Sequence, residues 1–570
     1  MAGIRLHAQL YSDLTRSFNF LIEMNMKKYI KYMVSMAALA SVVATGCKKD
    51  FFNRPPENSS TVGTYYQTVA QVQASTNALY AAPWFGYNTK VSWSISELMS
   101  GNGRSGSSDV VNFGNFSVAN GNFELSAAWN SLFTVVAQSN ALLNNLPTAA
   151  PASISPAVVN NALGEARLMR ATAYFYLVRL FGNVPLVENP TALASSFQTV
   201  PTNPVTDVYK FIIRDLKFAE ANCTPNVAST GHVSSGSASA LLSKVYLYMQ
   251  DYANARLEAE KVINSGEFGL LGVDVAGKSY QDLFMIANNN NRESIIALQW
   301  LANAGYGFGN GMQASLAFSS AITQTGDGYG VLAPTFDLQD AFKAAGDTIR
   351  RHACIMLPGE YYPELDKATG GYKLPYNASS QGTHAQIKKY VCGSPADNNG
   401  ASAFQATGEN TYIMRLADVY LIEAEAILGA SANPGVGHGL DTNATTSDPT
   451  AMKYFNLVRQ RAGIPAKTSI TFRDIIKERR LEFAVEGDYW YDLTRIDGFN
   501  SATHPNAIAI ISKQNRGDSS NGTAPFYKDF VRYNESFAPP TDAQFLFPIP
   551  ATEVAADPNL IKTPVPYVFK

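Results

Sequence analysis

Residues 237–265 read SASALLSKVYLYMQDYANARLEAEKVINS, two amphipathic segments that meet at the short polar break Gln250-Asp251. Small residues such as Ala240 and Ala255 let two helices approach closely, while bulky residues fill the space between them. The bulky residues in this stretch are Leu242, Tyr246 and Tyr252. This is the pattern of a tetratricopeptide helical hairpin, so the stretch predicts two helices joined by a tight turn.

Helical periodicity recurs along the rest of the chain. Apolar residues at three- and four-residue spacing occur in segments 161–181, 206–221, 411–429, 450–463 and 471–487. Segments 411–429 and 450–463 resemble a second hairpin, with a Gly/Asn/Thr-rich insertion between them. Because one hairpin cannot bury its own apolar face, several must stack. The sequence therefore predicts a mainly α fold in which tetratricopeptide-like hairpins form the scaffold.

Two long stretches between these segments are predicted to be loops. Residues 83–122 and 302–335 are rich in Gly, Ser and Asn, and loops of this length in a compact protein are usually functional. Residues 294–300 (SIIALQW) have strand propensity, so a minor β component is expected beside the helices.

The segment from Met26 to Cys47 has the order of a bacterial lipoprotein signal. Three lysines precede an apolar stretch at 32–43, which is shorter than the roughly 18 residues that cross a bilayer as a helix. Small residues then lead directly to Cys47, as in a lipobox. We therefore expect the true start at Met26 and lipid attachment at Cys47.

The chain is accordingly divided into four parts. Residues 1–46 form the signal-peptide region, and residues 47–60, which are polar and contain prolines, form a lipidated tether. An N-terminal part, 61–235, and a C-terminal part, 236–570, are expected to form one intimately packed body.

Composition excludes several classes of function. The charge is nearly balanced, with 44 Lys plus Arg against 46 Asp plus Glu, which disfavours nucleic acid as a partner. Beyond Cys47 only Cys223, Cys354 and Cys392 remain, too few for a disulfide scaffold, although a single Cys354–Cys392 bridge stays open. The chain has no GxSxG, HExxH or CxxC motif, and its histidines lack ligand spacing. We therefore expect no catalytic residues, no metal and no cofactor.

Five motifs together resemble the SusD/RagB family, in the family's own order. They are GEARLMRATAYFYLVRLFGNVPLV (164–187), NTYIMRLADVYLIEAEAILG (410–429), NLVRQRAGI (456–464), ERRLEFAVEGDYWYDLTR (478–495) and FLFPIPATEVAADPNL (545–560). The resemblance implies a tetratricopeptide-like scaffold with long ligand-binding loops, anchored by lipid in the outer membrane and facing the cell exterior. It further implies a nutrient ligand, with oligosaccharide expected, and a partner: a SusC-like TonB-dependent transporter over which the protein sits as a lid.

The carboxylates of the ERR motif allow a catalytic alternative. Glu478, Glu482 and Glu486 share one face at four-residue spacing, with Arg479 and Arg480 alongside. Paired carboxylates are what a glycosidase needs. Carboxylates that alternate with arginines tend to be neutralised rather than poised for proton transfer, so we favour an ion-pair lattice over Trp490 and Phe483 in the core.

The ligand site is predicted on loop aromatics, because a sugar ring presents a flat apolar C–H face that stacks on exposed aromatic rings, with polar side chains at its rim. Trp129 and Trp490 lie in helical segments and are assigned to the core. The candidate ligand-binding residues are Trp84, Tyr87, Trp93, Asn102, Arg104, Tyr306 and Phe308.

Three rival functions differ in class from glycan capture. The first rival keeps the same scaffold and binds peptides, which a comparison of glycan and peptide binding would reveal. A surface glycosidase would release product from a glycan. A purely structural tetratricopeptide adaptor would bind its partner and no small solute.

Overall fold

The computed structural model describes residues 65–189, 200–432, 443–517 and 537–569. The signal-peptide region, the expected start at Met26, Cys47 and the tether lie outside these residues. From Tyr66 onward the chain forms one compact unit. In the described ranges no helix is both long and apolar enough to cross a membrane.

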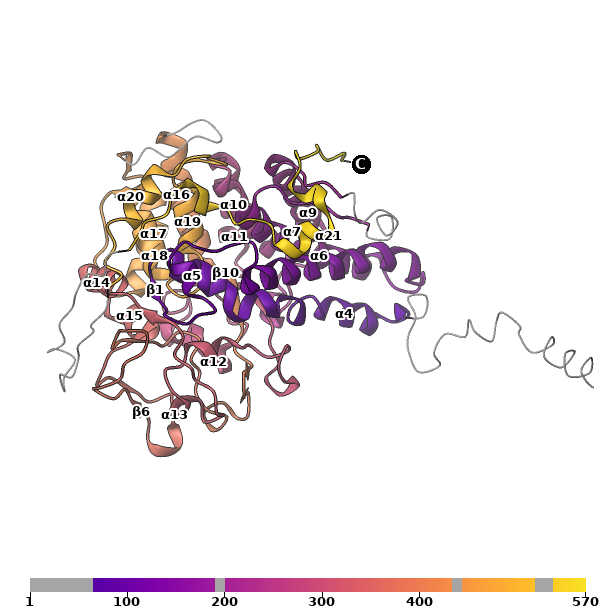
Figure 1. Ribbon diagram of the computed structural model, residues 1–570. Coiled ribbons are helices and arrows are strands. Elements are labelled where there is room, and N and C mark those ends of the chain that lie inside the picture. Colours follow the sequence, from indigo (N-terminus) through magenta and orange to yellow (C-terminus); the bar gives the residue numbers. More distant parts are fainter. Residues whose placement is uncertain (1–64, 190–199, 433–442, 518–536, 570) are drawn as a thin grey trace, which may run out of the picture. The chain divides into compact units, whose positions relative to one another are not determined.

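Long helices form the scaffold, as the periodicity predicted. They are α6 (Phe123–Ala149), α7 (Pro156–Phe181), α9 (Val205–Asn222), α10 (Ser235–Tyr248), α11 (Tyr252–Ser265), α16 (Leu416–Ala432), α17 (Pro449–Arg461) and α18 (Phe472–Glu482). Helix α7 packs against α6 and α9, α10 packs against α9 and α11, and α11 packs against α16 (Figure 1). Each helix thus buries its apolar face against its neighbours, and the predicted mainly α, hairpin-based fold is confirmed.

The hairpin of α10 and α11 has the predicted turn. Gln250 takes a positive φ of 57°, and the side chain of Asp251 accepts a hydrogen bond from the backbone N–H of Asn254, which caps α11. Helix α16 then approaches α11 so closely that a Cβ on Gly429 would lie 2.5 Å from the ring of Tyr252. A glycine is therefore required where these two helices cross.

Shorter helices complete the body. They are α4 (Val69–Asn77), α5 (Val111–Gly114), α12 (Met312–Leu316), α13 (Ser320–Thr323), α14 (Phe336–Ala345), α15 (Thr348–Cys354), α19 (Tyr489–Arg495), α20 (Pro505–Ile511) and α21 (Ala551–Ala556). Segments with 3₁₀ or π character include η1 (Ala82–Trp84), η2 (Tyr87–Val91), η3 (Ser94–Met99) and η8 (Ala302–Ala304).

The β component is minor. Strand β2 (Ser294–Leu298) pairs antiparallel with β10 (Thr411–Arg415), which confirms the expected strand and shows that the predicted helix 411–429 begins only at Leu416. The other strands are two residues long and pair as β1 (Gly103–Arg104) with β3 (Ala333–Pro334), β4 (Ile355–Met356) with β7 (Gln386–Ile387), β5 (Tyr361–Tyr362) with β6 (Tyr372–Lys373), β8 (Ser402–Ala403) with β9 (Ala406–Thr407), and β11 (Thr445–Thr446) with β12 (Ile470–Thr471).

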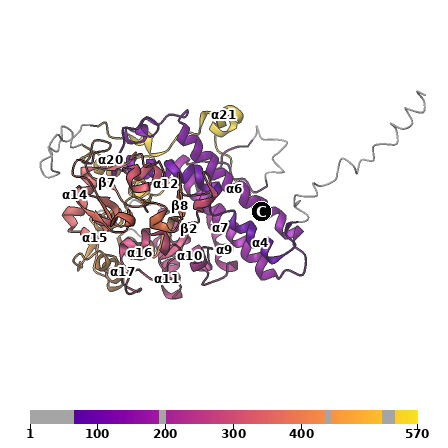
Figure 2. The ribbon, with the colours of Figure 1, turned by 90° about the horizontal axis from the view of Figure 1, so that it is seen from below.

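Loops and short elements gather beside the helical scaffold. Figure 1 shows the segment that contains α12, α13 and β6 at one side of the molecule, away from α9 and α10. Seen from below in Figure 2, α12 and β8 lie over the region between α6 and α14. The predicted loop 302–335 belongs to this group of loops.

The predicted loop 83–122 is wrong in its first half. Residues 82–99 form the consecutive segments η1, η2 and η3, and irregular backbone begins only after Ser100, where it is interrupted by β1 and α5. The Pro, Gly and Asn content suggested a loop, but buried side chains and π-type turns hold this segment against α6 and α19. The three described cysteines are buried and free, so the bridge left open between Cys354 and Cys392 is not formed.

Candidate functional site

The predicted ligand-binding residues separate into a buried and an exposed group. Trp84 is 0% exposed and Trp93 1%, and their indole N–H groups donate to the carbonyls of Leu79 and Thr89. The expectation that these tryptophans are exposed stacking platforms is therefore wrong, because η1 to η3 turn them into the interior. Trp129 and Trp490 are buried, which confirms their assignment to the core.

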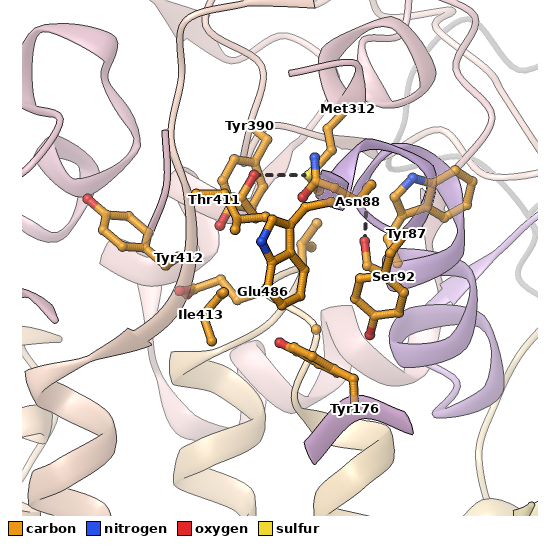
Figure 3. A pocket seen from close by; sticks show the side chains of 15 residues that line it. Tyr87, Asn88, Ser92, Tyr176, Met312, Tyr390, Thr411, Tyr412, Ile413 and Glu486 are labelled. Atoms are coloured by element: carbon orange, nitrogen blue, oxygen red, sulfur yellow. Dashed lines mark hydrogen bonds between the residues drawn. The ribbon is translucent and has the colours of Figure 1, made fainter. Parts of the chain in front are cut away.

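Tyr87 is also buried. Its hydroxyl hydrogen-bonds that of Tyr491 at 3.0 Å, and it lines an interior cavity of about 30 Å³. Figure 3 shows Tyr87 and Asn88 on one side of this cavity and Tyr390 and Tyr412 on the other. The cavity has room for about two water molecules, which is too little for a sugar ring.

Asn102 is a buried structural residue. Its amide donates to the Glu97 carboxylate at 3.0 Å and accepts from Arg480 at 2.7 Å. Burial raises the pKa of Glu97, while hydrogen bonds such as that from Asn102 oppose the shift. The prediction that Asn102 borders an exposed site is wrong. Arg104 is half-buried in β1, opposite Ala333 of β3.

Tyr306 and Phe308 are the predicted residues that the structure does expose, at 67% and 50%. Two further aromatic side chains, Tyr329 and Phe404, are exposed on neighbouring segments. We call Tyr306, Phe308, Tyr329 and Phe404 the aromatic face. Sequence reasoning missed both Tyr329 and Phe404. Phe404 stands in ASAFQAT (401–407), and an aromatic residue inside a polar turn is a signal that could have identified it.

Direct contacts hold the segments of the aromatic face together. The turn between β8 and β9 carries Phe404, and its neighbour Gln405 donates from its amide to the hydroxyl of Tyr329 at 2.8 Å. Segment η8 packs against both β8 and β9, and a Cβ on Gly309 would lie 2.5 Å from Ala406. Tyr306 in turn packs edge-on against Phe85, with ring centroids 4.7 Å apart.

Side-chain amides fix the backbone beneath the aromatic face. Asn310 exchanges backbone hydrogen bonds with Thr407, and its side-chain amide donates to the carbonyl of Glu409 at 2.8 Å. Gln381 joins two other loops, because its amide donates to the carbonyl of Gly330 and accepts from the N–H of Gly106. Loops that are fixed in this way lose little conformational entropy when a ligand binds.

The glutamates of the ERR motif form a buried ion-pair lattice, as predicted. Glu482 receives hydrogen bonds from Arg350 and Arg415 at 3.0 Å each, and a third ion pair comes from Arg461. Although burial acts to raise the pKa of Glu482, the three guanidinium groups hold it well below its ordinary value. A carboxylate in this state cannot serve as a general acid near neutral pH.

The other charged residues of the ERR motif also form ion pairs, which argues against a catalytic role for the motif. Helix α18 ends at Glu482, so the predicted helix 471–487 is too long and Glu486 lies beyond it, next to Lys389 and Arg415. Arg479 bonds three aspartates at 2.6–2.8 Å. In the described ranges no group of three or more His, Cys, Asp or Glu side chains is arranged to hold a metal ion.

Fold and site together define a class: a helical, tetratricopeptide-like binding protein whose loops present exposed aromatic side chains. The chain matches a family model described as SusD family over residues 292–565 and one described as starch-binding associating with outer membrane over residues 50–247. It is 33% identical to a SusD-like protein of Bacteroides ovatus, over 95% of this chain and 100% of that protein. The chain therefore belongs to the SusD/RagB family.

Solved structures agree with this assignment. A crystal structure with a xylogluco-oligosaccharide has a TM-score of 0.75 and 32% identity, and covers 88% of this chain and 99% of that chain. A laminarin binding SusD-like protein has a TM-score of 0.64 and 25% identity, and covers 88% of this chain and 100% of that chain.

Proposed function

We propose that this protein is a non-catalytic outer-membrane lipoprotein that captures oligosaccharide and delivers it to a SusC-like TonB-dependent transporter. The observation that carries the proposal is the aromatic face, a set of exposed rings on loops that are already fixed by side-chain amides. Relatives that bind xylogluco-oligosaccharide and laminarin support glycan as the ligand class.

The chemistry of the aromatic face fits sugar better than peptide. Exposed rings stack on the apolar C–H faces of pyranoses, and polar groups beside them satisfy the hydroxyls. Tyr329 and Gln405 form such a polar edge next to Phe404. A peptide site in an extended-chain mode would instead need an open strand edge for main-chain hydrogen bonds.

Binding measurements test the proposed ligand class. The folded protein is titrated with xylogluco-oligosaccharide, laminarin and a wider glycan panel, and in parallel with a peptide library. Saturable binding of at least one glycan supports the proposal. Binding of peptides and of no glycan would assign the scaffold to peptide capture, and release of reducing sugar by the pure protein would favour the glycosidase.

The lipid anchor is proposed from the sequence order around Cys47. Labelled fatty acid is expected to enter the wild-type protein and not the Cys47→Ser variant, because only the thiol accepts the lipid. Membrane fractionation and fluorography of both proteins check this. Equal labelling of the two proteins would refute the assignment of Cys47.

A stable complex with an outer-membrane barrel is expected from family membership. Affinity purification from membranes solubilised in mild detergent should recover a barrel of roughly 20 strands or more, within the size range of such transporters. Mass spectrometry identifies the partner. Recovery of this protein alone in several mild detergents would contradict the proposed delivery step, while leaving the ligand measurements intact.

A further inference from the structure

A pocket of about 90 Å³ opens where α7 and α10 end and α9 begins. Its walls include Arg179 in the last turn of α7, Tyr248 at the end of α10 and Thr494 in α19, and none of its residues belongs to the aromatic face. Figure 1 shows α9 and α10 away from the segment that contains α12, α13 and β6. The pocket has room for roughly six water molecules, so it can hold a small ligand or the end of a chain.

Contacts between aromatic rings fix part of the pocket wall. The ring of Tyr209 packs edge-on against that of Phe499, with centroids 4.9 Å apart. Elsewhere in the wall, the ring of His504 stacks on that of Phe545, with centroids 3.9 Å apart and planes 1° from parallel. The pocket is therefore formed before a ligand arrives, and part of its surface is apolar.

Arg179 is the cation of this pocket. Its guanidinium carbon lies 3.9 Å from the ring centroid of Phe175 and 4.1 Å from that of Tyr491. One N–H donates to the carbonyl of Phe175 at 2.9 Å, and the hydroxyl of Tyr176 takes a second hydrogen bond. Within the described ranges Arg179 forms no ion pair with a carboxylate. Because a guanidinium has five N–H donors, Arg179 keeps donors for a ligand.

The other charged groups near the pocket are already paired. Arg495, a second arginine in the wall, is bound by two carboxylates. Asp488, whose charge acts on Arg179 from further away, is bound by Lys244 and Arg479. The pocket therefore presents one cation with free donors, which suits a ligand that carries a single negative charge.

A buried hydroxyl in the pocket wall also lacks a partner. Tyr248 is 3% exposed, and its hydroxyl has no hydrogen-bond partner in the part of the chain that the structure describes. Buried polar groups in native proteins are nearly always hydrogen-bonded, so this hydroxyl is one that a ligand oxygen can satisfy, directly or through water. The guanidinium carbon of Arg179 lies 5.1 Å from the centroid of the Tyr248 ring, so the two groups lie next to each other.

From this arrangement we infer that the pocket between α7, α9, α10 and α19 binds a hexuronate, a sugar that carries a carboxylate. The planar guanidinium of Arg179 matches a carboxylate in geometry and donates two parallel hydrogen bonds to it. The hydroxyl of Tyr248 and the exposed amide of Asn500 bind sugar hydroxyls, while Phe499 and Phe545 cover an apolar C–H face. The inference goes beyond the proposed function, because this pocket takes a charged sugar and shares no residue with the aromatic face.

Titrations with free sugars test the pocket. The wild-type protein should bind D-glucuronate or D-galacturonate and not glucose at the same concentration, because glucose lacks the carboxylate. In Arg179→Lys, which keeps the charge and loses the planar fork, affinity for the uronate should fall about tenfold or more. Affinity of this variant for neutral glycans should not change, because the aromatic face is intact. Ligand-observed NMR and calorimetry measure both ligands.

Two further variants separate the pocket from effects of charge and folding. Arg256→Gln removes a cation from α11, which contributes no residue to the pocket wall, and should leave the uronate affinity unchanged. Tyr248→Phe removes only the unpartnered hydroxyl, so the variant should be at least as stable as the wild type, while its uronate affinity falls about threefold or more. If Arg179→Lys melts early, Tyr248→Phe provides the deciding comparison.

The possible results separate the pocket from the aromatic face. Unchanged uronate affinity in folded Arg179→Lys, or an equal loss in Arg256→Gln, overturns the pocket as the binding site. Binding of inorganic phosphate in place of either uronate overturns the ligand class. Failure of the wild-type protein to bind a uronate overturns the inference and leaves the proposed function standing, since neutral glycans are measured separately.

Discussion

Replacing Tyr306 and Phe404 by alanine is expected to weaken glycan binding by about 1–2 kcal/mol for each ring, which is roughly a 5- to 30-fold higher Kd per substitution. A ring that stacks on a pyranose buries apolar area on both partners, and alanine removes that area. Both side chains are exposed, so the melting temperature should hardly change. Calorimetric titration and thermal melts of the same samples measure the two quantities.

Substitution of a buried tryptophan should have the opposite effect: it should lower stability and not affinity. Trp93→Ala removes a fully buried side chain, so it should destabilise the fold by about 3–5 kcal/mol. Its effect on affinity should be limited to what unfolding causes. Normal affinity of folded Tyr306→Ala and Phe404→Ala variants, together with lost affinity in a folded Trp93→Ala variant, would move the site from the aromatic face to the interior.

Glu482→Gln is expected to lower the free energy of unfolding by about 3–5 kcal/mol. The substitution removes one charge that balances Arg350, Arg415 and Arg461, all of them buried, and leaves those guanidinium groups with too few carboxylates. The folded pKa of Glu482 lies well below its ordinary value, so its contribution is present at neutral pH and is lost only as the pH falls toward that low pKa. Denaturant melts at pH 7 check the magnitude.

Glu409 serves as a control for Glu482, because its effect on stability changes with pH in the opposite direction. It is fully buried, its carboxylate oxygens have no nitrogen or oxygen partner, and the nearby Cys392 thiol donates to Gln313. Burial raises the pKa of Glu409 to about 8. Between the ordinary carboxyl pKa and about 8 the unfolded chain therefore binds fewer protons than the folded one, and stability falls as pH rises.

The stabilities of the Glu409→Gln and Glu482→Gln variants should therefore depend on pH in different ways. Glu409→Gln should gain stability relative to the wild type as the pH rises from 5 to about 8, whereas Glu482→Gln should be less stable throughout. Thermal melts over this range separate them. A folded Glu482→Gln variant with wild-type stability and no glycan turnover or binding would show that this helix serves the site rather than the scaffold.

These predictions differ in how far they depend on the fold. The alternation of carboxylates and arginines within one short motif predicted an ion-pair lattice, but it did not identify the partners of the glutamates. The three arginines that meet Glu482 come from distant positions, 350, 415 and 461. Their convergence required the packing of α15, α17 and β10 around α18.

Sequence alone determined the helical hairpins and the family, since periodicity and motif order are properties of neighbouring residues. For the aromatic side chains predicted to lie in loops, burial or exposure was decided by the tertiary structure alone. Trp84 and Tyr306 both stand in Gly-, Pro- or Asn-containing stretches, yet one lies in the core and the other in solvent. Burial depends on contacts between segments far apart in the chain, such as those of η1 with α6 and of η8 with β9. These contacts cannot be predicted from the local composition.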